Sequence, residues 1–518
     1  MAELTGNRLK DALLNPNTFC VTWELIPGRG AFEVTQQEVI ENAHKAAIKG
    51  KIHAISLTDN PGGAPAISPE MFAAEIKRAG VEPLVHVALR DKNRNESESI
   101  LHGLSMLHVK NLLILTGDYP SSAGFHGTAK PVFDLDSVHG LQLVEALNKG
   151  LEYEALGKKI FITPTDFFPG AAISPFKQTE AELMGQYYKL KMKIDAGAKF
   201  LVTQVGYDAR KFHELLQWLR INNYNTPVMA NIFILPYGAG RAMNTNKIPG
   251  CVVTDKLLAK LDEERKEQDK GKGARLDRAA KMYAFAKGMG YHGAHIGGHG
   301  ITCDMVEYII DKGEEFASNW EELVAEFDFT QKDGFYLFQK DEKNGLNTAT
   351  LAAKTSKPAN PPIYGFSRLV HKSLFNPHSF VFKGLTPLAK AIDKGPRMRS
   401  AFHKFEHVNK VVLYDCMDCG DCALFDTAFI CPMSQCPKGQ RNGPCGGSHE
   451  GWCEVYPTEK QCIWVRAYIR LKRSKEENSI TKNVVPPCNW ELQHSSSWLN
   501  FYLGRDHTSK KMGILPPK

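Results

Sequence analysis

Apolar and polar positions follow a regular order over roughly the first 300 residues. Short runs rich in Val, Ile, Leu and Phe have the composition of buried strands, and the stretches between them have helical period and often end at Gly. Eight strands that alternate with helices predict an α/β fold, a (β/α)8 TIM-type barrel. A doubly wound open sheet is the alternative, but no Gly-x-Gly-x-x-Gly follows the first run. We expect strands at residues 19–27, 52–58, 83–89, 111–118, 159–165, 200–206, 227–235 and 292–298, and helices at residues 36–50, 68–80, 96–107, 135–150, 179–197, 209–222 and 276–290.

The remaining segments suggest three parts. Residues 255–278 are highly charged and are expected to form a solvated helix pair within the seventh strand–helix unit, and residues 304–316 should form the last barrel helix. A Pro-rich linker follows at 354–362. We therefore expect a barrel domain at residues 1–320, a linker and basic connecting segment at 321–410, and a small cysteine-rich domain with a C-terminal tail at 411–518.

Composition narrows the class of protein. Hydrophobic residues make up 43% of the 518 residues and charged residues 23%, which is ordinary for a soluble globular protein. No run of 18 apolar residues occurs, so no membrane span is expected. The first residues lack the order of a signal peptide, so a cytoplasmic location is expected. The net charge of +7 permits an acidic ligand but does not argue for nucleic acid.

Polar residues gather where the predicted strands end. In a barrel the carboxyl ends of all strands meet at one mouth, where active sites lie. Each residue alone has a structural explanation, such as capping a helix or satisfying loop amides. Their succession on consecutive strand ends favours a site. These residues are Glu24 in the first run, Thr58 after the second, His86 and Arg90 with the third, Asp118 after the fourth, Asp166 after the fifth and Gln204 after the sixth.

The same stretches resemble the methylenetetrahydrofolate reductase family, in family order over roughly residues 15–310. No single stretch is specific, but the set is. The stretches are Val-Thr-Trp-Glu24-Leu-Ile-Pro-Gly-Arg-Gly, Thr58-Asp-Asn-Pro-Gly-Gly, His86 with Arg90-Asp-Lys-Asn-Arg, Leu115-Thr-Gly-Asp118-Tyr-Pro, Phe133-Asp-Leu-Asp, Lys191-Met-Lys193-Ile-Asp-Ala-Gly-Ala and Thr203-Gln204.

The resemblance implies a barrel that binds FAD and interconverts 5,10-methylenetetrahydrofolate and 5-methyltetrahydrofolate. By position, Glu24 matches the general acid of the family, Asp118 the aspartate beside flavin and pterin, and Gln204 a folate contact. The positions on the flavin side of the family's site are matched by Thr58, His86, Arg90 and Lys193.

The reaction needs groups of these types. The imidazolidine ring of the substrate must open before a hydride reaches its methylene carbon, so the departing nitrogen needs a proton. A carboxylic acid at an apolar strand end, as expected for Glu24, can keep a raised pKa and donate that proton. An ionised Asp118 would stabilise the cationic iminium, and an amide such as Gln204 suits a pterin edge. Arg90 and Lys193 suit the diphosphate of FAD.

The sequence departs from the family pattern at two places. The family often has Phe-Glu-Phe-Phe-Pro-Pro where this chain has Trp23-Glu-Leu-Ile-Pro-Gly28. The aromatic pair common after the glutamine is replaced by Val205-Gly206. Because aromatic residues there help to stack substrate and nicotinamide in the family, direct reduction by NAD(P)H is in doubt.

Nine of the 12 cysteines follow residue 415, which predicts a metal or disulfide module, and metal fits a chain without a secretory signal. The spacings of the first three cysteines match a ferredoxin run, but the gap to the fourth cysteine is eight residues. Eight thiolates would hold two [4Fe–4S] clusters, or one cluster and one zinc; structural zinc alone is the alternative. Cys488 is left out because it has no close partner in sequence. The expected ligands are Cys416, Cys419, Cys422, Cys431, Cys436, Cys445, Cys453 and Cys462.

The cysteine segment resembles the C-terminal domain found with some methylenetetrahydrofolate reductases of anaerobic one-carbon metabolism. Its most specific part is Cys431-Pro-x3-Cys-Pro-Lys with Asn442-Gly-Pro-Cys-Gly-Gly. The resemblance implies iron–sulfur clusters and sometimes zinc, with electrons passing to or from a partner, an electron-carrier protein or redox subunit.

Three functions remain open from the sequence. The first is a flavin-dependent folate oxidoreductase with an electron-delivery domain. The second is a folate-linked methyltransferase with zinc and no flavin. The third is an NAD(P)H-dependent reductase with a structural zinc docking domain. The electron partner, the direction, the grouping of the cysteines, the identity of the pterin and the oligomeric state, including a homo-oligomer, also stay open.

Overall fold

The computed structural model describes residues 5–352 and 361–516. The chain divides into two compact units. The first comprises the residues up to 353 together with Gly446–Glu450, and the second comprises the rest. Most of the expected Pro-rich linker, residues 354–360, lies outside the described residues. No helix in the described part of the chain is long and apolar enough to cross a membrane.

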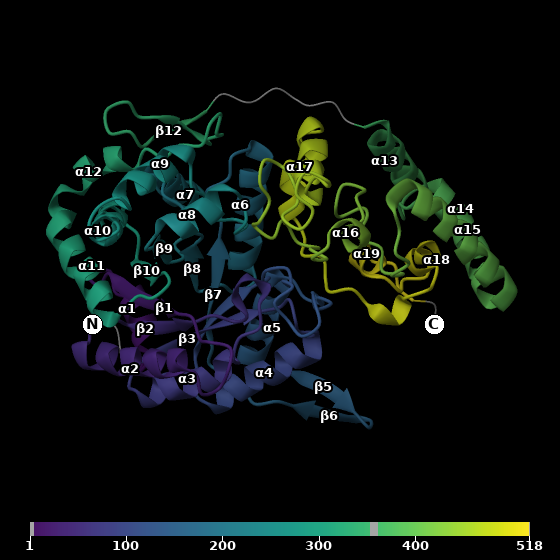
Figure 1. Ribbon diagram of the computed structural model, residues 1–518. Coiled ribbons are helices and arrows are strands. Elements are labelled where there is room, and N and C mark those ends of the chain that lie inside the picture. Colours follow the sequence, from purple (N-terminus) through teal and green to yellow (C-terminus); the bar gives the residue numbers. More distant parts are fainter. Residues whose placement is uncertain (1–4, 353–360, 517–518) are drawn as a thin grey trace. The chain divides into compact units, whose positions relative to one another are not determined.

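The first unit is built on a closed barrel of eight parallel strands, which confirms the predicted fold class (Figure 1). Its strand order is β1-β10-β9-β8-β7-β4-β3-β2. Seven of the eight predicted strands are found in it. The strands are β1 (Cys20–Leu25), β2 (Ala54–Leu57), β3 (Glu82–Ala88), β4 (Asn111–Leu115), β7 (Phe168–Ile173), β8 (Phe200–Thr203), β9 (Val228–Phe233) and β10 (Gly293–Gly297).

The predicted fifth strand, residues 159–165, was wrong. These residues contribute to an exposed antiparallel hairpin, β5 (Glu152–Ala155) and β6 (Lys158–Phe161), which projects from the barrel in Figure 1. The barrel strand is β7, whose Pro169 and Gly170 are unusual in strands. A Cβ on Gly170 would lie 2.3 Å from the ring of Phe200, so this position has no room for a side chain.

Helices surround the barrel, and those expected from the periodicity are all present. The charged segment forms α9 and the start of α10, and short elements extend the unit after α11. The helices are α2 (Val34–Lys49), α3 (Pro69–Arg78), α4 (Arg94–Met106), α5 (Ser137–Lys149), α6 (Glu180–Asp195), α7 (Ala209–Ile221), α8 (Tyr237–Asn244), α9 (Asp255–Glu264), α10 (Lys272–Met289), α11 (Cys303–Phe316) and α12 (Trp320–Leu323), with the 3-10 turns η1 (Pro61–Gly63), η2 (Ala317–Asn319) and η3 (Val324–Phe327) and the hairpin β11 (Phe338–Lys340) with β12 (Asn347–Leu351).

The N-terminal helix α1 (Arg8–Leu14) closes one end of the barrel. Its Leu9 and Leu13 are buried against side chains from the first residues of several strands, including Cys20 of β1 and Phe200 of β8. Burial of these apolar side chains stabilises the barrel floor. Because the floor is at the amino ends of the strands, the carboxyl ends form the open mouth, where a site is expected.

The second unit combines a helical part with the cysteine-rich segment. Long helices come first, and short helices lie among irregular loops that carry the cysteines (Figure 1, green to yellow). The elements are α13 (Pro362–Leu374), α14 (Phe380–Lys394), α15 (Pro396–Tyr414), α16 (Pro432–Gln435), α17 (Ile463–Arg473), η4 (Glu477–Thr481), η5 (Trp490–Leu492), α18 (Ser497–Tyr502) and α19 (His507–Lys511).

Candidate functional site: the barrel mouth and two groups of cysteines

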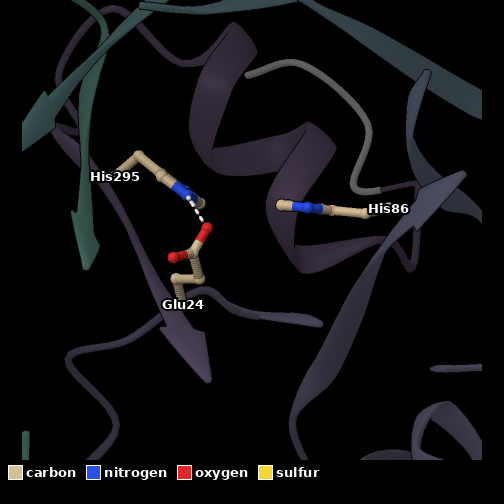
Figure 2. Close-up of side chains that lie close together, drawn as sticks. All are labelled: Glu24, His86 and His295. Carbon is tan, nitrogen blue, oxygen red and sulfur yellow. Dashed lines mark ion pairs between the residues drawn. The ribbon is translucent and has the colours of Figure 1, made fainter. Parts of the chain in front are cut away.

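Glu24 lies next to two histidines at the mouth of the barrel. It is the penultimate residue of β1, and its carboxylate points between His86 of β3 and His295 of β10 (Figure 2). Oε2 lies 3.5 Å from Nε2 of His295. A potential ligand atom from each of the three side chains lies within 4.8 Å of the other two, and both histidines are buried. The site therefore holds a carboxylate with two imidazoles, not an isolated acid.

Each of the two imidazoles lies within hydrogen-bond distance of a buried hydroxyl group. Nδ1 of His295 lies 2.8 Å from the hydroxyl of Thr22, which precedes Glu24 by two positions on the same face of β1. Nε2 of His86 lies 2.7 Å from the hydroxyl of Ser56. Both hydroxyls are fully buried. Because Thr22 engages Nδ1 of His295, Nε2 faces Glu24 and can exchange a proton with the carboxylate.

The pKa of Glu24 departs from the sequence expectation. Burial raises it, as predicted, but the hydrogen bond and charge of His295, with smaller effects of His86 and His299, outweigh burial, and the pKa is lowered. Burial lowers the pKa of His86 to about 4, so this imidazole is neutral at pH 7. The expected raised pKa of Glu24 was wrong because sequence reasoning did not include His295, 271 positions away in the chain.

Removing His295 should reverse this shift. In His295→Gln the largest opposing influence disappears and burial remains, so we expect the pKa of Glu24 to rise. A difference infrared titration against Glu24→Gln would then show the carboxylate band of Glu24 replaced by the band of the protonated acid at a higher pH than in the unaltered protein. His299→Gln is the matched control, since His299 has the smallest of these effects on Glu24. An unchanged or lower pKa in His295→Gln would contradict the assignment.

Asp118 lies exposed just beyond the end of β4 and connects three loops at the mouth. Its Oδ2 accepts a hydrogen bond of 2.8 Å from the backbone N–H of Gly62, and its carbonyl accepts one of 3.1 Å from Arg90. Arg90 is buried, donates to the carbonyl of Asn60 as well, and forms an ion pair with Asp91. Arg90 therefore holds the loops that present Asp118.

Gln204 follows β8 directly and lies beside a cysteine that the sequence did not single out as a site residue. The Sγ of Cys251 lies 3.7 Å from Oε1 of Gln204, which also accepts from the backbone N–H of Val205. Burial, with Asp118 and Glu24 as further causes, raises the pKa of the Cys251 thiol to about 12. Gly206 has no room for a side chain, because a Cβ would lie 2.4 Å from the ring of Phe176. Phe176 thus occupies space next to the position where the family has aromatic residues.

The other two predicted flavin-side residues occupy different environments. Thr58 follows β2 at the mouth, and its buried hydroxyl has no hydrogen-bond partner among the described residues. Lys193 lies in the last turn of α6 and donates to the carbonyl of Ala172 on β7 at 2.6 Å. Asp166 precedes β7 and pairs with Lys110 at 2.6 Å, so it lies at the amino end of the strand and not at the mouth.

Five residues from late in the chain complete this unit. Gly446–Glu450 group with the barrel, and the buried Lys177 donates to the carbonyls of Gly446 and Ser448. A small cavity beside Cys251 is lined by Ser448 and Glu450 among others. Sequence order gave no signal for this placement.

Comparison with protein families assigns the barrel to a family. A family model described as methylenetetrahydrofolate reductase matches residues 9–297, more than half of the chain. The chain belongs to the methylenetetrahydrofolate reductase family. A second model, described as the methylenetetrahydrofolate reductase C terminal, matches residues 395–491. Both resemblances drawn from the sequence are thereby confirmed, including the fusion of the two parts.

Solved structures and curated proteins add little to the family assignment. A Clostridium thermocellum protein described as binding two copies of 5-methyl-5,6,7,8-tetrahydrofolic acid shares 13% identity, with a TM-score of 0.41 over 60% of this chain and 99% of its own. The 7,8-dihydropteroate synthase of Vibrio fischeri shares 11%, with a TM-score of 0.32 over 58% of this chain and 95% of its own. No curated protein matches the chain.

In this reductase-family chain, four cysteines of the second unit surround one cavity. Cys416, Cys419, Cys422 and Cys431 line it together with the end of α15. Burial raises the pKa of Cys416 and of Cys422 to about 11. The backbone N–H of Asp418 donates to Cys416 at 3.4 Å. Buried thiols with donors aimed at them are suited to holding a metal centre.

The other four predicted ligands form a second group. Burial, followed by the charges of Cys445 and Cys453, raises the pKa of Cys436 to about 12, and burial with Cys445 and Cys436 raises that of Cys462. A β-bridge between Trp452 and Gln461 brings the flanking Cys453 and Cys462 toward each other. The grouping that the sequence left open is therefore four and four.

Cys488 belongs with the first group, although sequence reasoning set it aside. Its thiol hydrogen-bonds to that of Cys419. The residues around Cys488 do not predict this contact, because it joins two cysteines that are 69 positions apart in the chain. Cys488 is thus a neighbour of the first group and a ninth thiol of the module.

Proposed function

We propose that this protein is a flavin-dependent oxidoreductase that interconverts 5,10-methylenetetrahydrofolate and 5-methyltetrahydrofolate, with electrons passing through the cysteine module to or from a partner. The observation that supports it most is the carboxylate of Glu24 held beside His295 at the mouth of a reductase-family barrel, in the same unit as Asp118 and Gln204. This arrangement supplies a proton, a negative charge and an amide to one bound substrate.

FAD fits the polar groups at the mouth. The Thr58 hydroxyl and the Ser174 hydroxyl are buried without a hydrogen-bond partner among the described residues, and Oδ1 of Asn231 on β9 has none either. Unpaired buried polar atoms are costly, so a polar ligand is expected to satisfy them. Thr58, His86, Arg90 and Lys193 are the residues that we propose for the flavin side, with Asp118 facing both flavin and substrate. When bound, FAD would supply or accept the hydride.

Glu24 would transfer the proton to and from the substrate. Because its pKa is lowered, Glu24 is ionised at neutral pH in the free protein and must gain a proton before it can donate one. His295, 3.5 Å away and anchored by Thr22, can provide that proton. In methyl synthesis Glu24 would protonate the departing folate nitrogen, and in methyl oxidation it would take the proton back.

Asp118 and Gln204 would bind and orient the pterin. The Asp118 carboxylate is exposed at the mouth, where it can stabilise the cationic iminium formed on ring opening. The Gln204 amide can donate and accept with a pterin edge. Val205 and Gly206 lack the aromatic faces that would stack nicotinamide, which favours a carrier other than NAD(P)H as the electron source.

Both cysteine groups fit iron–sulfur clusters better than zinc. Four thiolates on one tetrahedral zinc, with Zn–S bonds of about 2.3 Å, would place sulfur atoms about 3.8 Å apart. Among the described residues, which include all 12 cysteines, no set of three thiols lies mutually within 4.8 Å. A [4Fe–4S] cluster is larger and takes one thiolate at each of four corners. We therefore propose one cluster for each group of four.

A spectrum of the anaerobically purified full-length protein tests the proposal against its alternatives. We expect flavin bands together with a broad iron–sulfur absorption that bleaches on reduction, and reduced methyl viologen should drive methylenetetrahydrofolate reduction. A colourless, zinc-containing protein would support the methyltransferase. Flavin with stoichiometric zinc and NAD(P)H-driven turnover would support the third hypothesis.

Lys410 should tune the potential of the first cluster. Its ammonium is buried, lies 3.5 Å from Sγ of Cys422 and pairs with Glu406. A positive charge stabilises the more negative reduced cluster, so Lys410→Met should lower the midpoint potential, by roughly 50–100 mV for one charged hydrogen bond. Lys404→Met, at an exposed position of the same helix, is the control. Equal potentials in an electron paramagnetic resonance redox titration would refute this role.

A further inference from the structure

The second unit contains a large apolar cavity that the proposed folate chemistry does not use. It has a volume of about 340 Å³, within the range of small-molecule sites. It lies between α13, α15 and α18 and is lined largely by aromatic and aliphatic side chains. The aromatic lining residues are Phe366, His371, Phe375, Phe405, Tyr414, Phe425, Phe429, Trp498 and Phe501.

The aromatic lining favours a flat ligand. The rings of His371 and Phe425 stack with centroids 3.9 Å apart and an angle of 3° between their planes, and Phe429 meets His371 edge-on at 5.9 Å. Phe375 contacts the rings of Trp498 and Phe501 on α18. Planar faces that are already ordered bind a planar ligand with little further loss of side-chain entropy.

The charged side chains in the lining disfavour an anionic ligand. The Lys410 ammonium is already bound to Glu406, to Ser497 at 2.7 Å and to the thiol of Cys422. Asp506 caps α19 by accepting from the backbone N–H of Ser509 at 2.8 Å. A phosphate or carboxylate entering the cavity would find no unpaired cation among these residues, so a nucleotide is disfavoured and a neutral ligand is favoured.

The imidazole of His371 remains available to such a ligand. No hydrogen bond from either ring nitrogen of His371 to a described residue is present, although the ring is half-buried in the cavity wall. Burial lowers the pKa of His371 to about 4, so its neutral ring has one N–H to donate at pH 7. A carbonyl oxygen on a flat apolar ligand is the complementary acceptor.

The cavity also adjoins the first group of cysteines. Lys410, Tyr414, Cys422, Leu424 and Ser497 line both this cavity and the one that the four thiols surround. A ligand here would therefore adjoin the first group, because Cys422 belongs to that group and lines this cavity. Quinones are neutral, flat, carbonyl-bearing molecules that exchange electrons, and they carry no phosphate.

We propose that this cavity is a binding site for a quinone, with the ring stacked among the aromatic side chains and a carbonyl accepting a hydrogen bond from His371. The exposed Phe366, Phe405 and Leu413 at its rim suit an apolar substituent on the quinone ring. The site goes beyond the proposed folate reaction, and ligand binding can be measured without turnover.

Calorimetric titration of the full-length, as-isolated protein with 2,3-dimethyl-1,4-naphthoquinone tests the site. This quinone has no vacant position for thiol addition, so the 12 cysteines do not react with it. We expect saturable binding of one quinone per chain, accompanied by fluorescence quenching that is smaller in Trp498→Phe. Absence of saturable binding to the unaltered protein would overturn the proposal.

Variants on α13 locate the binding. Val370→Trp fills the cavity and should weaken binding at least about 20-fold. The neighbouring Leu369→Trp, at an exposed position outside the lining, should change it less than about twofold. His371→Phe keeps the ring stack but removes the donor and should weaken binding about fivefold. Equal affinity in Val370→Trp and Leu369→Trp, or an unchanged affinity in His371→Phe, would contradict the site.

Competitors establish the class of ligand. Flavin mononucleotide should not displace the quinone, because its phosphate has no unpaired cation in the lining. 1-Decanol should displace it only weakly, because it has no ring to stack. Displacement by flavin mononucleotide at a concentration similar to that of the quinone would favour a nucleotide site, and displacement by decanol at a similar concentration would favour an unspecific apolar cavity. Either result would overturn the quinone assignment.

Discussion

Glu24→Gln should abolish methylenetetrahydrofolate reduction while leaving the flavin bound. Glutamine keeps the size of the side chain and its hydrogen-bonding reach toward His295, but it cannot transfer the proton that ring opening requires. Loss of a general acid typically costs 10²–10⁴ in rate, and we expect a fall of about 10³ in kcat with reduced methyl viologen as donor. Flavin content, measured after denaturation, should match that of the unaltered protein.

Glu38→Gln is the matched control for this experiment. Glu38 lies exposed on α2, and loss of its charge should change the rate less than about twofold. Turnover of Glu24→Gln within threefold of the unaltered protein would remove Glu24 from the acid role. Loss of flavin together with activity would instead assign Glu24 to cofactor binding, a result that the acid hypothesis does not predict.

The barrel could be predicted from the sequence because its strands are short, apolar and separated by helices with clear period. The exception, β7, shows why such patterns fail. Pro169 and Gly170 argue against a strand, whereas the apolar run of β-branched and aromatic residues at 160–162 resembles one. Only the packed barrel shows that Gly170 is needed beside Phe200, since that contact joins residues 30 positions apart.

Site residues at the ends of strands could be predicted from the sequence. Residues whose role depends on a partner distant in the chain could not. Glu24, Asp118 and Gln204 stand out because polar residues end apolar runs. His295 lies inside an apolar run, where a histidine has no local signal of function, and its effect on the pKa of Glu24 appears only when β1 and β10 pair. The same reason explains why Cys251 and the grouping of the cysteines required the folded chain.

The cysteine grouping makes a prediction that spacing alone could not make. If each group of four holds one [4Fe–4S] cluster, the protein contains about eight irons per chain. Cys431→Ala removes a ligand of the first group and Cys453→Ala one of the second, so each variant should lose about four irons, and the double variant should lose all of them. Cys303→Ala, at a buried cysteine of α11 in the first unit, should lose none.

Iron and zinc analysis of anaerobically purified protein, combined with electron paramagnetic resonance of the reduced state, measures these outcomes. The single variants should each keep one cluster signal, and the signals should differ because Lys410 lies beside only the first group. Loss of all iron from either single variant would contradict the four-and-four division. Two zincs and no iron in the unaltered protein would refute the electron-transfer role of the module but leave the proton chemistry at Glu24 intact, because the acid and the thiols lie in separate units of the chain.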